Sequence, residues 1–596
     1  MRASDSTVAS IFSSRVEYII PEFQRGYRWS EEKWQTLWID ILSVAESSDQ
    51  RPSHFIGPLI LITQVLSGNV VQHIVVDGQQ RLVTLTMIFC ALRDVAKEEN
   101  LEAFSKSIES ELSFIEPSTG HSRPKVLPRL EDKNTFSGIV IENRNHPIDK
   151  ESLVYKCFLF FRDKIRDHLS SPDLFNQKAP LDQLEGLYTT IMQRLRLVKV
   201  DLDDSDNPTQ IFESLNFKGE KLSEADLIRN FIFMQIPLAR HKEFDNQYWT
   251  PFEDLLRHAL NGKAVEDFPD ELTEFYYRYL ISNTEYFPRQ ALYPTFVRYI
   301  QDIQKKGSRN LDLVANDLKR YMRYYINIVK LQEKNHQLLT AFKRFGSLEV
   351  KTAIPLLLHL YSRYDPNFDD CQNKLSLQDF CDYLKVIESY VLRRAIFRMS
   401  SRQYGSIFAR AIHESQSKDQ ISNFLLSTKW PNDESIKQEL STFPIYHHES
   451  GKTRLILQEI ELALSGKEVV TFENLTIEHV LPQELNRDWK NALGENAPRT
   501  HARLRHVLGN LTLTARNSEL GQKPFLEKRK ILRESKVQLN RYFDVLEQWT
   551  EDEINARSKI LAEEFVKIWA VPKPSTSQQN KKSTAANQIS LEFSDL

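Results

Sequence analysis

The segment TIEHVLPQ, in the C-terminal part of the chain, carries residue types suited to hydrolysis of a phosphodiester. It places Glu478 and His479 at the expected end of a strand, just before Pro482. Such hydrolysis needs a base that activates water and a cation that stabilises charge on the leaving oxygen. A histidine suits the base, and glutamate and asparagine oxygens suit a hard cation such as Mg²⁺. A lone E-H pair is more often structural, but the later segment LGNLTLTARN adds Asn510 and Asn517.

The charge around this segment supports the same chemistry. Residues 479–541 contain 13 Lys and Arg against 6 Asp and Glu, a net charge of +7, whereas the whole chain carries −3. A local basic region suits a nucleic-acid backbone, and we expect Arg516, Lys523 and Lys528 to contact DNA. The alternative for the stretch LEKRKILRESK is a solvated basic helix, which is common by itself.

A second polar cluster interrupts two apolar runs in VVDGQQRLVTL. Its members are Asp77, Gly78, Gln79, Gln80 and Arg81. The pattern predicts a strand, a polar turn and a helix, and the N-terminus of a helix favours a phosphate. Gly78 allows close approach of a ligand, and Arg81 offers a planar fork to phosphate oxygens. Asp77 suits a metal or a ribose hydroxyl, and the two glutamines suit a water or a base.

The alternative for this cluster is a capped turn with Asp77 as the N-cap residue. A nearby segment, IPEFQRGYRW, bears on the choice. Core packing explains its aromatic residues, Tyr27 and Trp29, but it explains Gln24 and Arg25 poorly. We therefore expect Gln24 and Arg25 to lie beside the DGQQR cluster in a binding site.

The elements that position these clusters follow from hydrophobic spacing. Residues 17–25 predict a short strand that leads into a turn at Pro21, and HFIGPLILI and VVQHIVVD predict two more strands. After Ser30, an apolar helical face is predicted, formed by Trp34, Leu37, Trp38, Ile41 and Leu42. Ser223 and Asp226 resemble a capping box at the start of another helix. Residues 240–440 are helical in pattern, and short β-like runs return within 471–517.

The helical middle contains four arginines close together in sequence. These are Arg393, Arg394, Arg398 and Arg402. They are candidates to contact DNA or to bridge two catalytic domains, and equally to be solvated or paired with acids. We treat this region as a connector.

Composition limits the class of protein. A chain of 596 residues with 41% hydrophobic residues and only 17 Gly predicts several soluble, mainly helical domains. The four cysteines form no C-x-x-C pair, which fits a reducing cytosol. The N-terminus does not resemble a signal peptide, and no apolar stretch is long enough for a membrane span. We expect a cytoplasmic protein without membrane contact.

Three segments in order resemble the N-terminal domain of GmrSD-type modification-dependent restriction systems. They are IPEFQRGYRW, VVDGQQRLVTL and IFESLNFKGEKLSEADLIRN. That domain is described as ParB- and sulfiredoxin-like, and its D-G-Q-Q-R element belongs to a site that hydrolyses nucleotides. The resemblance implies nucleotide-site roles for Asp77, Gln79, Gln80 and Arg81, with Gly78, Gln24 and Arg25 beside them. Asn216, Gly219 and Asp226 match the third segment.

Residues 440–545 resemble an HNH (ββα-metal) nuclease of the kind found in the C-terminal domain of GmrSD-type proteins. The resemblance makes His479 the general base and Glu478 an acidic metal ligand. Asn510 matches the asparagine that braces the base-bearing loop, and Asn517 matches a metal-facing catalytic position where many HNH enzymes have His. Trp489, Phe525 and Lys528 also match.

The resemblance implies an α+β, predominantly helical multidomain protein. The expected parts are a nucleotide-binding domain (1–238), a helical connector (239–440), an HNH domain (441–571) and a disordered tail (572–596).

The implied function is an NTP-regulated, metal-dependent endonuclease that senses modified double-stranded DNA and cleaves foreign (phage) DNA in bacterial defence. The cofactors would be Mg²⁺ or Mn²⁺ and an NTP, with GTP, UTP, CTP and ATP not distinguished. A related architecture, the SspE type, works with phosphorothioate-marked host DNA, so a base or a backbone modification is the trigger. The alternative is a non-cleaving, nucleotide-responsive DNA-binding regulator. A homo-oligomer is left open.

Overall fold

The protein is described by a computed structural model in two compact units. The described residues are 2–12, 15–21, 24, 26–46, 53–65, 71–116, 120–128, 130–141, 148–170, 179–202, 223–260, 268–305, 310–368, 373–466 and 471–572. The first unit comprises Met1–Pro251 with Ile300–Ala315, and the second comprises Phe252–Tyr299 with Asn316–Leu596. The chain is a predominantly helical α+β protein, as expected.

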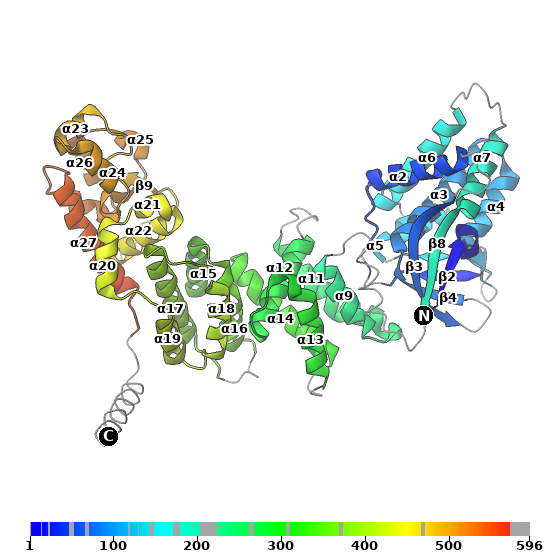
Figure 1. Cartoon of the computed structure of the whole chain (residues 1–596), viewed down its shortest axis with the longest axis horizontal. Coiled ribbons are helices and arrows are strands. Elements are labelled where there is room, and N and C mark those ends of the chain that lie inside the picture. Colours follow the sequence, from blue (N-terminus) through cyan, green and yellow to red (C-terminus); the bar gives the residue numbers. More distant parts are fainter. Residues whose placement is uncertain are drawn as a thin grey trace, which may run out of the picture. The chain divides into compact units, whose positions relative to one another are not determined.

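A six-stranded mixed sheet organises the first unit (Figure 1). In spatial order its strands are β1 (Arg2–Thr7), β8 (Leu195–Leu202), β3 (His54–Val65), β4 (Val71–Asp77), β2 (Val16–Ile19) and β7 (Val126–Leu127). The pairs β1–β8 and β3–β4 are antiparallel, and the other three pairs are parallel. The predicted strands in HFIGPLILI and VVQHIVVD are thus confirmed as neighbours. The first predicted strand is also present and ends at Ile19, before the turn expected at Pro21.

Helices cover one face of this sheet and form the larger core. The principal ones are α2 (Glu31–Glu46), α3 (Gln79–Glu98), α6 (Leu153–Ser170) and α7 (Pro180–Thr189). α3 is apolar around most of its circumference and is buried along nearly its whole length, which places it at the centre of the unit. A smaller cluster on the other face includes Ile60, Val76 and Val200, and Leu227 and Met234 of α9 (Glu224–Met234) pack against it.

Two local predictions in this unit are confirmed by the structure. α2 begins at Glu31, directly after Ser30, and buries Trp34, Leu37, Trp38 and Ile41, although Leu42 is only half-buried. The capping box at α9 is present, because the Ser223 hydroxyl accepts from the Asp226 N–H while the Asp226 carboxylate accepts from the Ser223 N–H. Further elements are α1 (Val8–Phe12), α4 (Glu102–Leu112), β5 (Ser113–Ile115), β6 (Ser122–Pro124), α5 (Leu130–Ile141), η1 (Thr190–Arg194), η2 (Leu238–Arg240), α10 (His241–Phe244) and η3 (Asp245–Trp249).

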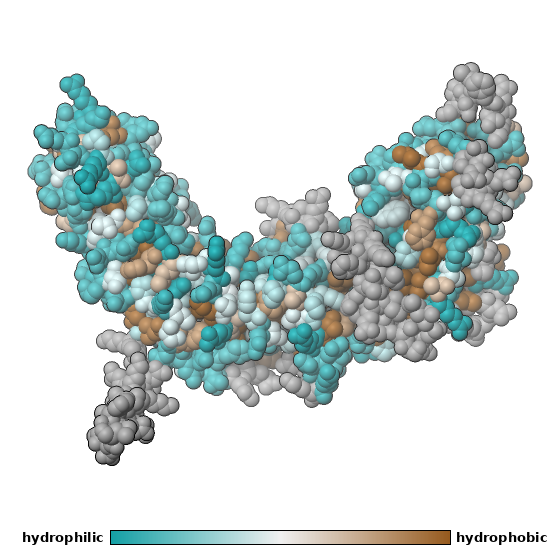
Figure 2. Space-filling model, viewed as in Figure 1, coloured by the Kyte–Doolittle hydropathy of each residue, from teal (hydrophilic) through white to brown (hydrophobic). Residues whose placement is uncertain are grey.

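The second unit is also mainly helical, and so are the stretches of sequence where the chain passes from one unit to the other. They are α11 (Thr250–Ala259), α12 (Phe268–Asn283), η4 (Arg289–Ala291), α13 (Leu292–Lys305), α14 (Leu311–Val329), α15 (His336–Leu348), η5 (Lys351–Ala353), α16 (Ile354–Tyr364), α17 (Leu377–Ile396), α18 (Tyr404–His413), α19 (Lys418–Ser427), α20 (Asp433–Thr442), α21 (Ile445–His448) and α22 (Ser450–Ser465). The face shown in Figure 2 is largely hydrophilic, with hydrophobic residues in small groups. No helix in the described ranges is both long and apolar enough to cross a membrane.

The C-terminal part of this unit contains a small two-stranded sheet. β9 (Thr476–His479) pairs antiparallel with β10 (Leu511–Thr514), which confirms the predicted return of β structure. The surrounding elements are α23 (Arg487–Leu493), α24 (Ala497–Leu504), η6 (Leu508–Asn510), α25 (Asn517–Leu520), α26 (Phe525–Arg533), η7 (Gln538–Phe543) and α27 (Glu551–Ile568). Their core is built around Trp489, Phe543 and Trp549.

The four arginines of the helical middle differ in their surroundings. Arg393 is fully buried and donates to the carbonyls of Pro431 and Trp569 and to the Asp433 carboxylate. Arg394 is buried and donates to backbone carbonyls. The DNA-contact interpretation is therefore wrong for these two, which hold helices together.

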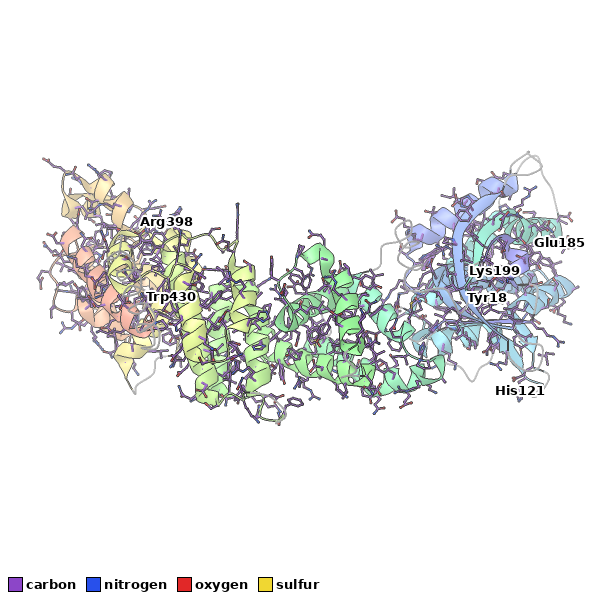
Figure 3. The ribbon with its side chains drawn as sticks, turned by 60° about the horizontal axis from the view of Figure 1, so that its bottom comes forward. Tyr18, His121, Glu185, Lys199, Arg398 and Trp430 are labelled. Carbon is purple, nitrogen blue, oxygen red and sulfur yellow. The ribbon has the colours of Figure 1, made fainter. Side chains whose placement is uncertain are left out.

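The other two arginines of this group are exposed. Arg398, labelled in Figure 3, forms an ion pair with Glu439 at 3.3 Å. Arg402 also lies on the surface. The predicted division of the chain into four parts stays a prediction, and the predicted tail from Lys573 onward lies outside the described residues.

Candidate functional site

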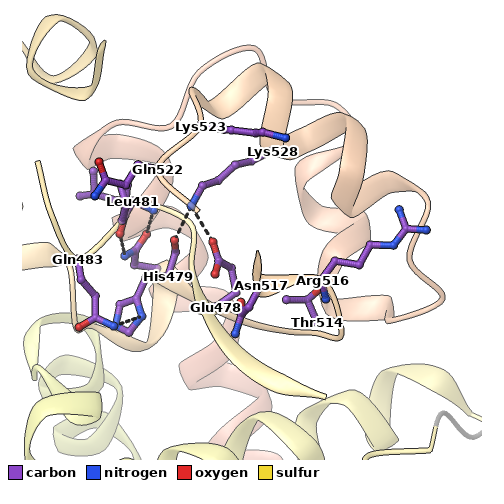
Figure 4. A network of polar contacts seen from close by, with 12 residues as sticks. Glu478, His479, Leu481, Gln483, Thr514, Arg516, Asn517, Gln522, Lys523 and Lys528 are labelled. Atoms are coloured by element: carbon purple, nitrogen blue, oxygen red, sulfur yellow. Dashed lines mark hydrogen bonds and ion pairs between the residues drawn. The ribbon is translucent and has the colours of Figure 1, made fainter. Parts of the chain in front are cut away.

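The end of β9 opens into a pocket of about 520 Å³ in the second unit. Glu478 and His479, the last two residues of the strand, line it together with Gln483 from the following loop and Asn517 at the start of α25. Figure 4 shows these side chains around the strand end. The pairing of β9 with β10 brings together residues that are separated in sequence by more than thirty positions.

His479 is buried, with only 5% of its surface exposed. Its Nδ1 lies 3.4 Å from Nε2 of Gln483, and its Nε2 lies 3.1 Å from Nδ1 of His506. Burial, reinforced by nearby His506 and Lys528, lowers the pKa of His479 to about 3. The imidazole is therefore neutral at physiological pH, which is the form that accepts a proton from water.

Glu478 is held by a buried lysine (Figure 4). Lys528 Nζ donates to Glu478 Oε1 at 2.6 Å and to the His479 carbonyl at 2.9 Å. Burial raises the pKa of the Glu478 carboxyl and lowers the pKa of the Lys528 ammonium, while each charge opposes the other's shift. Lys528 is 0% exposed, so the prediction that it contacts DNA is wrong: it neutralises Glu478 inside the protein.

Asn510 and Asn517 lie on either side of β10 and use their amides differently. Asn510 is fully buried and binds the backbone of Leu481, in the loop after β9, and of Arg505. Asn517 Nδ2 donates to Thr476 Oγ1 at 2.6 Å and to the Ile477 carbonyl at 3.1 Å. Asn517 Oδ1 is buried and has no hydrogen-bond partner among the residues that the structure describes.

The pocket residues fit a hard divalent cation that keeps much of its water. Within the described ranges there is no cluster of three or more His, Cys, Asp and Glu suited to a metal. The pocket instead offers the Glu478 carboxylate and the unpartnered Asn517 Oδ1. Mg²⁺ is commonly held by one or two protein oxygens together with water and substrate phosphates. This donor set therefore suits Mg²⁺ or Mn²⁺ better than Zn²⁺.

Two of the predicted DNA contacts remain on the surface near the pocket. Arg516 is partly exposed and forms an ion pair with Glu534 at 2.5 Å. Lys523 is exposed and has no ion-pair partner in the described part of the chain. Both cations are accessible to a phosphate backbone, although Arg516 would have to exchange its carboxylate partner.

In the first unit, the DGQQR cluster lies where β4 meets α3. Gly78 adopts φ +97° and is the N-cap residue, without a side-chain cap, so the alternative with Asp77 as N-cap is wrong. Arg81 Nη1 donates to the Pro58 carbonyl at 2.6 Å and lies 3.9 Å from Asp77 Oδ2. Gly57 has φ +113°, and a Cβ there would lie 2.7 Å from Arg81 Nε. The strand, the turn and two glycines thus form a close cradle around Arg81.

The glutamines of this region mostly form hydrogen bonds to backbone groups. Gln80 Oε1 accepts from the Arg28 N–H at 2.8 Å, and its Nε2 donates to the Gly26 carbonyl at 3.1 Å. Gln24 Nε2 donates to the Val76 carbonyl at 2.9 Å. Gln80 therefore positions the 26–28 segment through one hydrogen bond at each end of its amide. Gln79 Oε1 is buried without a hydrogen-bond partner in the described part of the chain.

Three predicted residues, Arg25, Asn216 and Gly219, lie outside the described residues. Asp226 lies in the capping box of α9, where its carboxylate binds Ser223. Capping the N-terminus of α9 therefore accounts for Asp226 at this position.

Comparison with protein families decides the identity of the chain. The GmrSD restriction endonuclease N-terminal domain matches residues 8–233, and the GmrSD restriction endonuclease C-terminal domain matches residues 430–564. The two matches together cover more than half of the chain. The chain belongs to the GmrSD restriction endonuclease family. Among curated proteins, none matches it.

Both clusters of this GmrSD protein lie inside the matched domains. The family name implies DNA cleavage in restriction defence, which is hydrolysis of DNA phosphodiesters. The C-terminal match includes the pocket at His479, and the N-terminal match includes Asp77 and Arg81. The family membership agrees with the resemblance that the sequence motifs predicted.

Sequence reasoning missed three neighbours of His479 in this GmrSD site. His506 bonds its ring, Gln483 contacts its other nitrogen, and Tyr446 packs edge-on with ring centroids 4.6 Å apart. The one feature of the sequence that could have pointed to His506 is its position four residues before Asn510. Nothing in the spacing of residues along the sequence indicates that Tyr446 lies beside His479 at the end of β9.

Proposed function

We propose that this GmrSD protein is a metal-dependent DNA endonuclease with His479 as the general base. The observation that carries the proposal is the pocket that gathers the buried His479 with oxygens of Glu478 and Asn517. The assignment of the C-terminal domain as HNH (ββα-metal) and of the N-terminal domain as ParB- and sulfiredoxin-like belongs to the same proposal.

Each residue in or near the pocket has a separate role in the proposed hydrolysis. Glu478 and Asn517 would hold Mg²⁺ or Mn²⁺, which when bound stabilises negative charge on the leaving oxygen. His479 accepts a proton from the attacking water through its pocket-facing nitrogen. Asn510 holds the loop after the base, and Lys523 and Arg516 contact the DNA backbone. Lys528 keeps the Glu478 carboxylate in place without reaching DNA.

Nicking of supercoiled plasmid in Mg²⁺ or Mn²⁺ tests this assignment. His479→Ala should reduce cleavage about 10²–10⁴-fold while DNA binding in a gel-shift assay persists. His448→Ala is the control, because His448 is an exposed histidine of the same unit that stacks on Phe443. Normal cleavage by His479→Ala would reject the site. Binding without cleavage by the wild-type protein, across modified DNAs, metals and NTPs, would favour the regulator alternative.

We also propose that the first unit binds a nucleoside triphosphate at the start of α3. The supporting observations are the unpartnered, buried Gln79 Oε1 and the Arg81 guanidinium, both at the N-terminus of a 20-residue helix. A helix N-terminus and a fixed arginine favour phosphate oxygens. Asp77, with its side chain partly exposed, is placed for a ribose hydroxyl or a phosphate-bound cation.

Isothermal titration with GTP, UTP, CTP and ATP in turn tests this second proposal. Arg81→Ala should weaken binding of the preferred nucleotide, and Lys97→Ala should not, because Lys97 lies at the other end of the same helix. Equal affinity of wild type and Arg81→Ala would remove Arg81 from the site.

We further propose that the nucleotide regulates cleavage of modified foreign DNA in bacterial defence. The support is that one chain carries both the pocket at His479, proposed for DNA cleavage, and the Arg81 site at the start of α3, proposed for the nucleotide. Digestion of DNAs with base or phosphorothioate modifications, each with and without every NTP, tests it. Cleavage that is indifferent to both NTP and modification would contradict regulation.

A further inference from the structure

The ring of His479 is bonded at both nitrogens by side chains of its own chain. Gln483 lines the pocket, and its amide Nε2 lies 3.4 Å from Nδ1, so Nδ1 is the nitrogen on the pocket side. On the opposite edge, Nε2 lies 3.1 Å from Nδ1 of His506. An N···N separation of this size requires one hydrogen between the two rings.

The two contacts agree on where the proton of His479 resides. A side-chain amide N–H donates, so the Gln483 contact requires a lone pair on Nδ1 of His479. A neutral imidazole with a lone pair on Nδ1 carries its proton on Nε2. That N–H then donates to His506 Nδ1. The opposite tautomer would place a proton on the pocket-facing nitrogen, where it could not act as a base.

Contacts with Tyr446 also fix the orientation of the His506 ring. Tyr446 stacks on it with ring centroids 5.7 Å apart and an interplanar angle of 16°, and its N–H donates to the His506 carbonyl at 3.3 Å. The same Tyr446 packs edge-on against His479. His506 stands four residues before Asn510, so one short segment braces both the base and the loop that follows it.

We propose that His506 is a positioning residue that holds His479 in the tautomer whose Nδ1 lone pair faces the pocket. This inference rests on the proposed nuclease function. For His479 to take a proton from water, the water must replace the Gln483 amide N–H at Nδ1. The Nε2–H stays bonded to His506, which stabilises the imidazolium that forms. Partners that orient a metal-ligating histidine typically contribute about 10–100-fold to metal affinity or activity, and we expect a contribution of this size from His506.

Three substitutions in the full-length protein separate this role from packing. His506→Phe keeps a ring against Tyr446 but removes the acceptor, and His506→Leu removes both. His506→Asn restores an acceptor, because its Oδ1 replaces Nδ1. His447→Phe is the matched control, since His447 stacks on His506 but has no bond to His479 among the described contacts.

Steady-state cleavage kinetics, DNA affinity and melting temperature are measured for each variant. We expect His506→Phe and His506→Leu to lower kcat about 10–100-fold with KM little changed, and His506→Asn to recover most of kcat. His447→Phe should match wild type. Equal losses in His506→Phe and His506→Asn, or full kcat in His506→Phe, would overturn the inference. If His506→Phe does not fold, the comparison of His506→Leu with His506→Asn decides.

The outcome is distinguishable from failure of the proposed function. Cleavage that persists in His479→Ala refutes the nuclease assignment itself. Loss of cleavage in His479→Ala together with full activity of His506→Phe refutes only the role of His506.

Discussion

Asn510 clamps Leu481 through both ends of its amide. Its Oδ1 accepts from the Leu481 N–H at 2.7 Å, and its Nδ2 donates to the Leu481 carbonyl at 2.8 Å. The same Oδ1 accepts from Trp549 Nε1 at 3.0 Å, and Nδ2 also donates to the Arg505 carbonyl at 2.9 Å. Leu481 stands two residues after His479, so this buried amide fixes the path of the chain that leaves the proposed base.

Asn510→Ala should therefore destabilise the C-terminal part of the second unit. It leaves two N–H groups and two carbonyls buried without this partner, and each buried unsatisfied group costs about 1–3 kcal/mol, so the expected loss is on the order of 3 kcal/mol or more. Scanning calorimetry measures it. Asn496→Ala is the control, because Asn496 precedes α24 without a side-chain cap bond. Equal melting temperatures for the two variants would show that Asn510 has no bracing role.

The Glu478–Lys528 pair makes a prediction that separates stability from catalysis. Lys528→Met removes the buried counter-charge and should cost about 3–5 kcal/mol, because Glu478 is left charged and unpaired. The double variant Lys528→Met with Glu478→Gln should recover much of this stability, since neither charge remains. It should not recover cleavage, because the carboxylate proposed to hold the cation is gone. Recovery of cleavage by the double variant would exclude Glu478 from the metal site.

Local sequence signals predicted the elements that carry the site. The change from an apolar run to DGQQR and back correctly marked the end of β4 and the start of α3. The Ser223–Asp226 capping box and the strand containing Glu478 and His479 were also correct. Each of these depends on neighbours within a few residues, where spacing and hydrogen-bonding chemistry are readable without the fold.

Residues whose role depends on distant partners could not be assigned in this way. Lys528 lies in a stretch of basic residues that resembles a solvated helix, yet it is buried because Glu478 lies 50 positions away in sequence and 2.6 Å away in space. Gln80 looked like a ligand-reading amide, but the 26–28 backbone uses both of its ends. His506 was missed because its bond to His479 spans 27 positions.

His73 makes a prediction about pH in the first unit. Its ring is buried against Tyr18, with centroids 5.3 Å apart, and Nδ1 lies 2.8 Å from Thr63 Oγ1. Burial, with a smaller effect of Lys199, lowers the pKa of His73 from 6.5 to about 4. Between these values the unfolded chain binds more protons than the folded one, so the free energy of unfolding falls as pH falls.

The expected loss from this residue is about 2 kcal/mol between pH 7 and pH 4.5. Urea unfolding across this range measures it. His73→Asn should flatten the pH dependence, because the asparagine does not titrate, even though it lowers stability at pH 7. A slope equal to that of wild type would show that other groups cause the loss.

Asn517 provides the sharpest test of the cation proposed for the pocket at the end of β9. Its Nδ2 is anchored on Thr476 and Ile477 of β9, which leaves Oδ1 buried and unpartnered beside Glu478 in the pocket lining. A carbonyl oxygen in that position is an expected ligand for Mg²⁺ or Mn²⁺. Asn517→Ala should raise the Mg²⁺ concentration for half-maximal plasmid cleavage about 10–100-fold, with DNA affinity in the absence of metal unchanged. Gln522→Ala is the matched control, because Gln522 lines the same pocket and bonds Glu484 instead. If both variants need the same Mg²⁺ concentration as wild type, then Asn517 anchors the strand end only, and the cation must be held by other oxygens.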